Sequence, residues 1–255
     1  MPTAAGIFYS EVNAQITATP PVILIHGAGS DHLCWPAPLR RLKGRRTIAL
    51  DLPGHGRSGG TAQQSVSGTA AQLFEFLVEI NVFQAILVGH SLGGAIALQA
   101  ACDHPERIAA LGIIAGGAYL ALPADLVEQI THLSTQPVGV QLLAQRLFSP
   151  GTPPDTAQKT LAGMTSVRPG VLAGDWRAAA DFDVRGCLGS IQAPVWAASG
   201  AEDRLVPPSC ARFLTANLAN SRLQIIPRSG HMVIHEAPAE LAQGLQLFLD
   251  QITAI

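Results

Sequence analysis

The sequence predicts an α/β protein in which a mostly parallel sheet is covered by helices on both faces. Short runs of β-branched and aliphatic residues recur along the chain, and most are apolar at every position, as strands buried on both faces require. Helix-length segments separate several of these runs, and this alternation implies a parallel sheet. The chain has 255 residues, of which 48% are hydrophobic, so it can bury one large core.

The predicted elements follow one another in a regular order. Residues 7–9 form a short first run, which we expect to add an antiparallel edge strand. Six further apolar runs, each bounded by Gly, Pro or Asp, predict strands at residues 22–25, 47–50, 86–88, 111–114, 195–198 and 223–226. Helices are predicted at residues 69–81 and 92–103, and the spacing of apolar residues predicts a closing helix at residues 239–252.

One long interruption separates the strand ending near Ala115 from the one starting at Val195. It spans roughly 75 residues without a convincing strand, which is too long for a simple loop. It contains four amphipathic pieces separated by Pro and Gly, at residues 125–133, 140–148, 157–164 and 171–180. We therefore predict a single domain, 1–255, with a core of residues 1–117 and 188–255 and a helical cap at about 118–187.

Composition and charge exclude several classes of function. Charged residues make up only 13% of the chain and the net charge is −2, so neither a nucleic-acid footprint nor a polybasic membrane-binding segment is present. The amino-terminal residues lack a signal-peptide pattern, and no run of about 18 apolar residues predicts a membrane span. We expect a cytoplasmic protein, monomeric or a small homo-oligomer, in which the four scattered cysteines are free thiols.

The strongest chemical signal is Gly89-His90-Ser91-Leu92-Gly93. An apolar strand runs into this Gly-x-Ser-x-Gly pattern and a helix of small residues follows it. Glycines two residues on either side let the serine occupy a very sharp turn, which holds its hydroxyl out at the carboxyl end of the sheet. The pattern predicts that Ser91 is a catalytic nucleophile.

A serine nucleophile needs a base, and the base needs an orienting acid. After a sharp turn of this kind the chain order is serine, acid, histidine. Asp203 follows the strand at 195–198, and His231 follows the strand at 223–226, so both are expected on the same face as Ser91. Glu202 is adjacent but should point elsewhere, and His235 is expected at the start of the final helix.

The tetrahedral intermediate of acyl transfer needs two preorganised hydrogen-bond donors. The backbone N–H of Leu92, directly after the nucleophile, is one candidate. The other is the N–H of Ala28, in the glycine-rich loop after the first buried strand. His26 is expected to be structural, and the pattern in this loop does not match a phosphate-binding motif. The charged turn at residues 51–58 is likewise explained by turn architecture.

Together these motifs resemble the α/β-hydrolase superfamily, in particular its compact, capped, esterase-like branch. The resemblance rests on residues 22–30, 51–58, 89–94, 194–207 and 230–238, and residues 171–184 are similar to the return from cap to core. It implies an eight-stranded, mostly parallel sheet, no cofactor and no metal. It also implies the catalytic triad Ser91, Asp203 and His231. Relatives with an aspartate nucleophile are excluded because position 91 is serine.

The expected substrate is a small, uncharged, moderately apolar carboxylic ester. Its pocket is predicted to be lined by Leu33, Trp35, His90, Tyr119, Leu142, Leu143, Phe148, Trp176, Val206 and Met232. Fold and triad do not determine the reaction. Cleavage of a C–C bond, cofactor-free perhydrolysis, hydroxynitrile lysis and slow-turnover ligand reception therefore stay open as alternatives.

Overall fold

The computed structural model describes residues 2–165 and 167–252 and contains one eight-stranded sheet in the order β1-β2-β4-β3-β5-β6-β7-β8. From β4 to β8 all neighbouring strands are parallel, whereas β2 pairs antiparallel with β4, as the sequence predicted. The predicted place of this strand at the edge is wrong, because the two-residue β1 pairs with its outer side. The strands are β1 (Thr3–Ala4), β2 (Ile7–Val12), β3 (Val22–Ile25), β4 (Thr47–Leu50), β5 (Ala85–His90), β6 (Ile108–Ile114), β7 (Val195–Gly200) and β8 (Ser221–Ile226).

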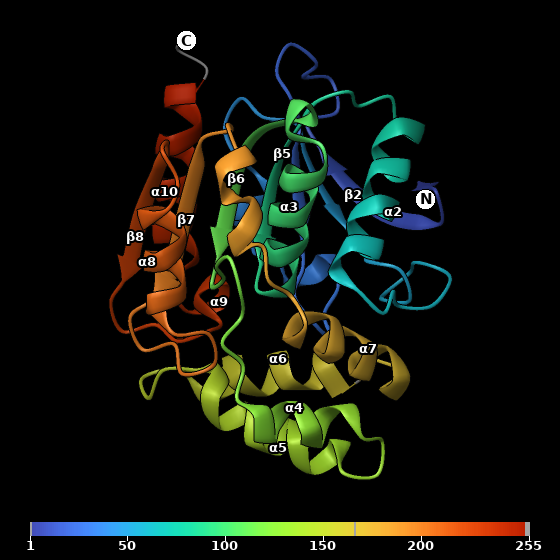
Figure 1. The fold of residues 1–255 in the computed structure, drawn as a ribbon, viewed down its shortest axis with the longest axis vertical. Coiled ribbons are helices and arrows are strands. Elements are labelled where there is room, and N and C mark those ends of the chain that lie inside the picture. The colour runs from blue at the N-terminus through green and yellow to red at the C-terminus, as the bar shows by residue number, and fades with distance from the viewer. Residues whose placement is uncertain (1, 166, 253–255) are drawn as a thin grey trace.

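Helices cover both faces of this sheet (Figure 1). Successive residues of a strand point to opposite faces. On β6, Ile113 packs against Gly94 of α3 (Leu92–Asp103), while a Cβ on Gly112 would meet Leu245 of α10 (Pro238–Ile252). The other core helices are α1 (Ala37–Arg40), α2 (Val66–Glu79), α8 (Pro208–Ala216) and α9 (Val233–Glu236). α2 packs beside α3 and α1 beside α10, so each face has its own helical layer.

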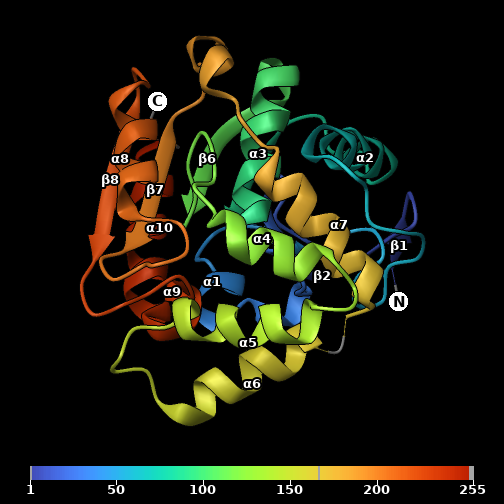
Figure 2. The same ribbon diagram turned by 60° about the horizontal axis from the view of Figure 1, so that its bottom comes forward.

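Four helices fill the long interruption between β6 and β7. They are α4 (Ala124–Thr131), α5 (Gln136–Leu147), α6 (Pro154–Thr165) and α7 (Pro169–Ala180). Figures 1 and 2 show these inserted helices gathered together beyond the carboxyl ends of the parallel strands. The short helix η3 (Arg185–Ser190) then leads back to β7. Among the described residues, no helix combines the length and apolar character that a membrane span needs.

Two details of the predicted elements are wrong. The starts of α5, α6 and α7 were placed after their prolines, but these prolines lie in the first turn, where a missing N–H is harmless. His235 does not begin the final helix: it belongs to the separate short helix α9, and Pro238 starts α10.

The prediction of four free thiols is also wrong for one pair. Cys102, at the end of α3, forms a disulfide with Cys187 in η3, and their Cα atoms are 6.0 Å apart. Their separation of 85 positions along the chain concealed this proximity, since only the packing of the return segment against α3 brings them together. Cys34 and Cys210 are free.

Candidate active site

Ser91 occupies a sharp turn between the end of β5 and the start of α3. Its backbone has φ +54° and ψ −118°, a conformation that costs a non-glycine residue about 1–3 kcal/mol and that clusters at functional sites. Glycines on both sides permit the turn. A Cβ on Gly93 would lie 2.0 Å from the Ile25 carbonyl oxygen, and a Cβ on Gly89 would lie 2.1 Å from the Gly93 carbonyl oxygen. The turn therefore holds Ser91 at the carboxyl edge of the sheet.

His231 and Asp203 lie in loops that follow neighbouring strands. Nδ1–H of His231 donates to Oδ2 of Asp203 at 2.9 Å, and both side chains are buried. The second oxygen of Asp203 accepts the backbone N–H groups of Leu205 and Val206, each at 2.9 Å. These bonds fix the carboxylate, which in turn orients the imidazole and leaves its Nε2 available. Glu202 is exposed and does not take part in this contact.

Close approach of the two loops brings this pair together. A Cβ on Gly200, at the end of β7, would lie 2.2 Å from the Gly230 carbonyl oxygen, so the two backbones touch. Two other acidic residues, Asp181 and Asp183 near the return segment, are exposed, and Asp183 pairs with Arg185. The geometry therefore favours Asp203 as the carboxylate partner of His231.

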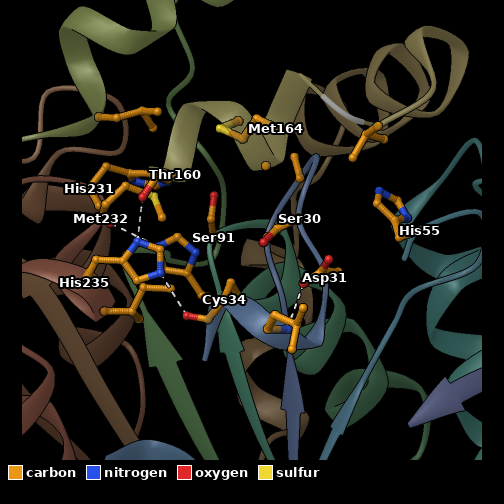
Figure 3. Close-up of a pocket in the computed structure, with 18 of the residues that line it drawn as sticks. Ser30, Asp31, Cys34, His55, Ser91, Thr160, Met164, His231, Met232 and His235 are labelled. Atoms are coloured by element: carbon orange, nitrogen blue, oxygen red, sulfur yellow. Dashed lines mark hydrogen bonds between the residues drawn. The ribbon is translucent and has the colours of Figure 1, made fainter. Parts of the chain in front are cut away.

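Ser91 and His231 line a common cavity of about 780 Å³. Figure 3 shows both residues around this space, with Met164 from α6 above them. Its floor comes from the carboxyl edge of the sheet, and residues of α5, α6 and α7 form much of the remaining wall. The cavity is large enough for a small organic substrate, whose typical sites measure about 300–1,000 Å³.

Two buried histidines near Ser91 have lowered pKa values. Burial lowers the pKa of His90 to about 3, assisted by its closeness to His231. Nε2–H of His90 donates to the carbonyl oxygen of His231 at 3.0 Å, so His90 helps to hold the backbone of the candidate base. Burial also lowers the pKa of His26 well below its ordinary value. Nε2 of His26 accepts the Leu52 N–H, and Nδ1–H donates to the Gly27 carbonyl oxygen at 2.8 Å.

The loop after β3 lies directly against Ser91. A Cβ on Gly27 would be 3.3 Å from Cβ of Ser91, and both Gly27 and Ala28 line the cavity. Leu92 is buried at the first position of α3, where backbone N–H groups have no partner within the helix. The Ala28 and Leu92 N–H groups therefore flank the turn that carries Ser91, from two different elements.

In the charged turn after β4, Asp51 and His55 have different roles. Asp51 is a structural carboxylate: it accepts the backbone N–H of His32 and of Arg57, and Nδ1 of His32 lies 2.7 Å from it. The ligand atoms of Asp31, His32 and Asp51 lie within 4.8 Å of one another, yet these hydrogen bonds already occupy the Asp51 carboxylate. His55 is different, since it lines the cavity, a role the sequence analysis did not assign.

Half of the predicted pocket residues line this cavity. They are Leu33, His90, Leu143, Trp176 and Met232. The remaining five are not among the described residues that line it, because packing with the core or with other elements occupies their side chains. They are Trp35, Phe148 and Val206, which are buried, Leu142, which packs on the core, and Tyr119, whose ring meets that of Phe213 edge to face.

Sequence analysis missed a polar wall formed by α6. Thr156, Lys159, Thr160 and Gly163 line the cavity at i, i+3, i+4 and i+7 spacing, which is one face of a helix. That spacing was visible in the sequence, but the prediction of the pocket relied on the apolar residues of the inserted segment and did not consider this polar face. The Thr160 hydroxyl hydrogen-bonds to Nδ1 of His235 at 2.9 Å, and Nε2–H of His235 donates to the Cys34 carbonyl oxygen (Figure 3).

Comparison with known proteins agrees with this architecture. The model of the alpha/beta hydrolase family matches residues 22–244. A dihydrolipoyllysine-residue acetyltransferase component of an acetoin cleaving system from Pseudomonas putida is 32% identical over 90% of this chain, which spans only 63% of that protein. A pimeloyl-[acyl-carrier protein] methyl ester esterase from Serratia marcescens is 28% identical, covering 89% of this chain and 93% of the relative.

A solved structure shares the fold at lower sequence similarity. A thermophilic esterase from Thermogutta terrifontis superposes with a TM-score of 0.86 at 21% identity, covering 96% of this chain and 93% of that one. The family match extends from β3 into α10 and so includes the strands that carry the serine turn and both loops of the Asp203–His231 pair. On these grounds the chain belongs to the alpha/beta hydrolase family.

Proposed function

We propose that this chain is a serine hydrolase that cleaves a moderately apolar carboxylic ester. The observation that carries the proposal is the Asp203–His231 hydrogen bond, made at the carboxyl edge of the sheet beside the strained turn of Ser91. Serine, base and orienting acid are the three parts that acyl transfer through a serine requires. The esterase from Serratia marcescens, which is similar over nearly its whole length, supports an ester as the scissile group.

In the proposed mechanism His231 removes the proton from Ser91 as the serine oxygen attacks the ester carbonyl. The Ala28 and Leu92 N–H groups donate to the developing oxyanion. Collapse of the tetrahedral intermediate breaks the bond to the alcohol, which takes the proton from His231. Water then loses a proton to His231 and attacks the acyl-enzyme, and the carboxylic acid leaves as Ser91 is reprotonated. Asp203 stabilises the imidazolium that forms in both halves of the reaction.

The residues that line the cavity indicate the chemical character of the substrate. Leu143, Leu147, Trp176, Leu205 and Met232 provide apolar surface, which suits an aliphatic or aromatic acyl group. On the α6 side the wall is polar and includes Lys159, with Arg168 just beyond the helix, although the sequence predicted an uncharged substrate. Both cations are exposed, so a carboxylate on the substrate could meet them without being buried.

The test is hydrolysis of a p-nitrophenyl ester series with acyl chains of two to ten carbons. Wild type is compared with Ser91→Ala and with Ser209→Ala, a control that removes an exposed hydroxyl from α8. We expect turnover by wild type and by the control, no turnover by Ser91→Ala, and a single fluorophosphonate adduct that Ser91→Ala does not form. Absence of turnover by wild type on every ester, or full activity of Ser91→Ala, refutes the proposal.

A further inference from the structure

The carboxylate of Asp175 is buried at the contact between the inserted helices and the core. Asp175 belongs to α7 and is 4% exposed. Its Oδ2 accepts the backbone N–H of Gly29 at 2.9 Å and Nε2–H of His55 at 2.8 Å. Gly29 lies 146 positions earlier in the chain, in the loop that carries Ala28. The carboxylate therefore connects α7 to the backbone of that loop.

Gly29 is placed so that α7 can press directly on this loop. Its φ is +65°, a conformation that glycine adopts without cost. A Cβ at this position would lie 2.8 Å from Cδ1 of Leu172, one turn before Asp175 on α7. The contact of Leu172 with the Gly29 backbone and the hydrogen bond from Asp175 thus come from the same helix. Both depend on the position of that helix against the core.

Ala28 lies between two peptide planes that are each held from outside the loop. The first plane contains the Gly27 carbonyl and the Ala28 N–H, which point in opposite directions because the peptide is trans. His26 donates to that carbonyl oxygen at 2.8 Å and so directs the Ala28 N–H away from itself. The second plane contains the Gly29 N–H, which Asp175 holds. The core and the insertion each fix one side of Ala28.

His55 balances the charge of Asp175. It is 2% exposed, and Nδ1 lies 3.1 Å from the Pro53 carbonyl oxygen while Nε2 faces Asp175. Because both ring nitrogens face acceptors, both donate in the protonated imidazolium form. Burial lowers the pKa of His55, but the hydrogen bond and the negative charge of Asp175 outweigh burial, so the pKa is raised overall. A charged pair at this place leaves no buried charge uncompensated.

We propose that Asp175 is a positioning residue for the oxyanion hole: from the inserted helices it holds the loop that presents the Ala28 N–H to the reacting carbonyl. The inference rests on the proposed function, since it assigns a role in the same acyl transfer. The inserted helices then do more than enclose the substrate. They complete the geometry of a group that acts on the transition state.

The expected consequence is a loss in kcat rather than in KM. Asp175→Asn keeps the size of the side chain but removes its charge and replaces one acceptor oxygen by a donor. Removal of one oxyanion donor costs about 10²–10³ in kcat. Since the substitution displaces the Ala28 N–H without deleting it, we expect a loss of about 10- to 100-fold in kcat, with KM for a neutral ester within about threefold of wild type.

The experiment compares Asp175→Asn with wild type and with Asp181→Asn, a control at the exposed carboxyl end of α7. Each variant is assayed for kcat and KM and for inhibition by an alkyl trifluoromethyl ketone, which forms a tetrahedral oxyanion on the serine. The matching methyl ketone, with the same chain, reports ground-state binding. We expect Asp175→Asn to lose trifluoromethyl ketone affinity in proportion to kcat, with little change toward the methyl ketone and none in the control.

Other outcomes overturn the inference. A rise in KM with kcat intact, or an equal loss of affinity for both ketones, means that Asp175 shapes the substrate pocket only. If Asp175→Asn does not fold, as judged by circular dichroism, Asp175→Glu takes its place, because it keeps the charge beside His55 but displaces the oxygen that accepts from Gly29. Unchanged kcat and ketone selectivity in that variant refute the proposal. Full activity of Ser91→Ala would instead refute the proposed function, so the two failures are distinguishable.

Discussion

The disulfide between Cys102 and Cys187 makes a prediction about stability that can be derived from chain length. The bond closes a loop with a sequence separation of 85, and closing a loop of that size removes roughly 4–5 kcal/mol of entropy from the unfolded chain in the simplest model. Measured effects of disulfides are commonly about 2–4 kcal/mol. For a chain of this size, each kcal/mol changes the melting temperature by about 2–4 °C. We therefore expect reduction to lower the melting temperature by roughly 4–16 °C.

The assay is thermal unfolding by circular dichroism with and without dithiothreitol. Cys187→Ser should melt near the temperature of the reduced wild type, and reductant should shift it no further. Thiol titration of the unreduced, denatured wild type should find two thiols, those of Cys34 and Cys210. Four titratable thiols, or one melting temperature in both conditions, would refute the reasoning. In a reducing cytoplasm we expect Cys102 and Cys187 to be reduced and the protein to have the lower of the two melting temperatures.

Three further predictions concern the turn, the pocket and pH. Gly93→Ala should destabilise the fold by more than about 2 kcal/mol in urea unfolding, because the new Cβ would meet the Ile25 carbonyl oxygen at 2.0 Å, whereas Gly186→Ala, in open space, should not. Lys159→Ala, but not exposed Lys43→Ala, should lower the kcat/KM ratio of a p-nitrophenyl hemiglutarate to the neutral butyrate by about 1.5- to 5-fold, the range of an exposed charge pair. Burial lowers the pKa of His90 to about 3 in the folded protein, whereas the unfolded chain binds this proton near pH 6.5. The free energy of unfolding should therefore decrease as pH falls from 6.5 toward 3. The difference in free energy of unfolding between pH 7 and pH 5, measured in urea, should be smaller for His90→Asn than for wild type.

Much of the fold could be predicted because parallel strands have an unambiguous pattern. The segments at 22–25 and 47–50 are apolar throughout and bounded by turn residues, and the structure places β3 and β4 at those bounds. Helix starts were less predictable, since a proline can end one segment or begin the next. The disulfide lay beyond reach for a different reason, because pairing depends on distance in space, which only the packing of η3 against α3 determines.

The pocket was harder to predict than the residues at the edge of the sheet. An apolar side chain in an amphipathic helix faces either the core or a cavity, and the sequence looks the same in both cases. Leu143 lines the cavity while Phe148, five positions later, does not. Thr156, Lys159 and Thr160 were the better indicators, since polar side chains on the inner face of a helix need a reason to be there. Their regular spacing distinguishes such a face from a loop.

The contact of Asp175 with Gly29 predicts which substitutions in the inserted helices lower kcat. If the inserted helices only enclosed the substrate, their substitutions would alter substrate choice and leave the rate of an unhindered ester intact. Because Asp175 of α7 binds the Gly29 N–H, a shift in the position of that helix would also move the proposed oxyanion donor, the Ala28 N–H. Substitutions at the contact, such as at Leu172, should therefore lower kcat even for a small acetate ester that reaches none of the inserted helices. Substitutions on the α6 face should change KM and selectivity instead.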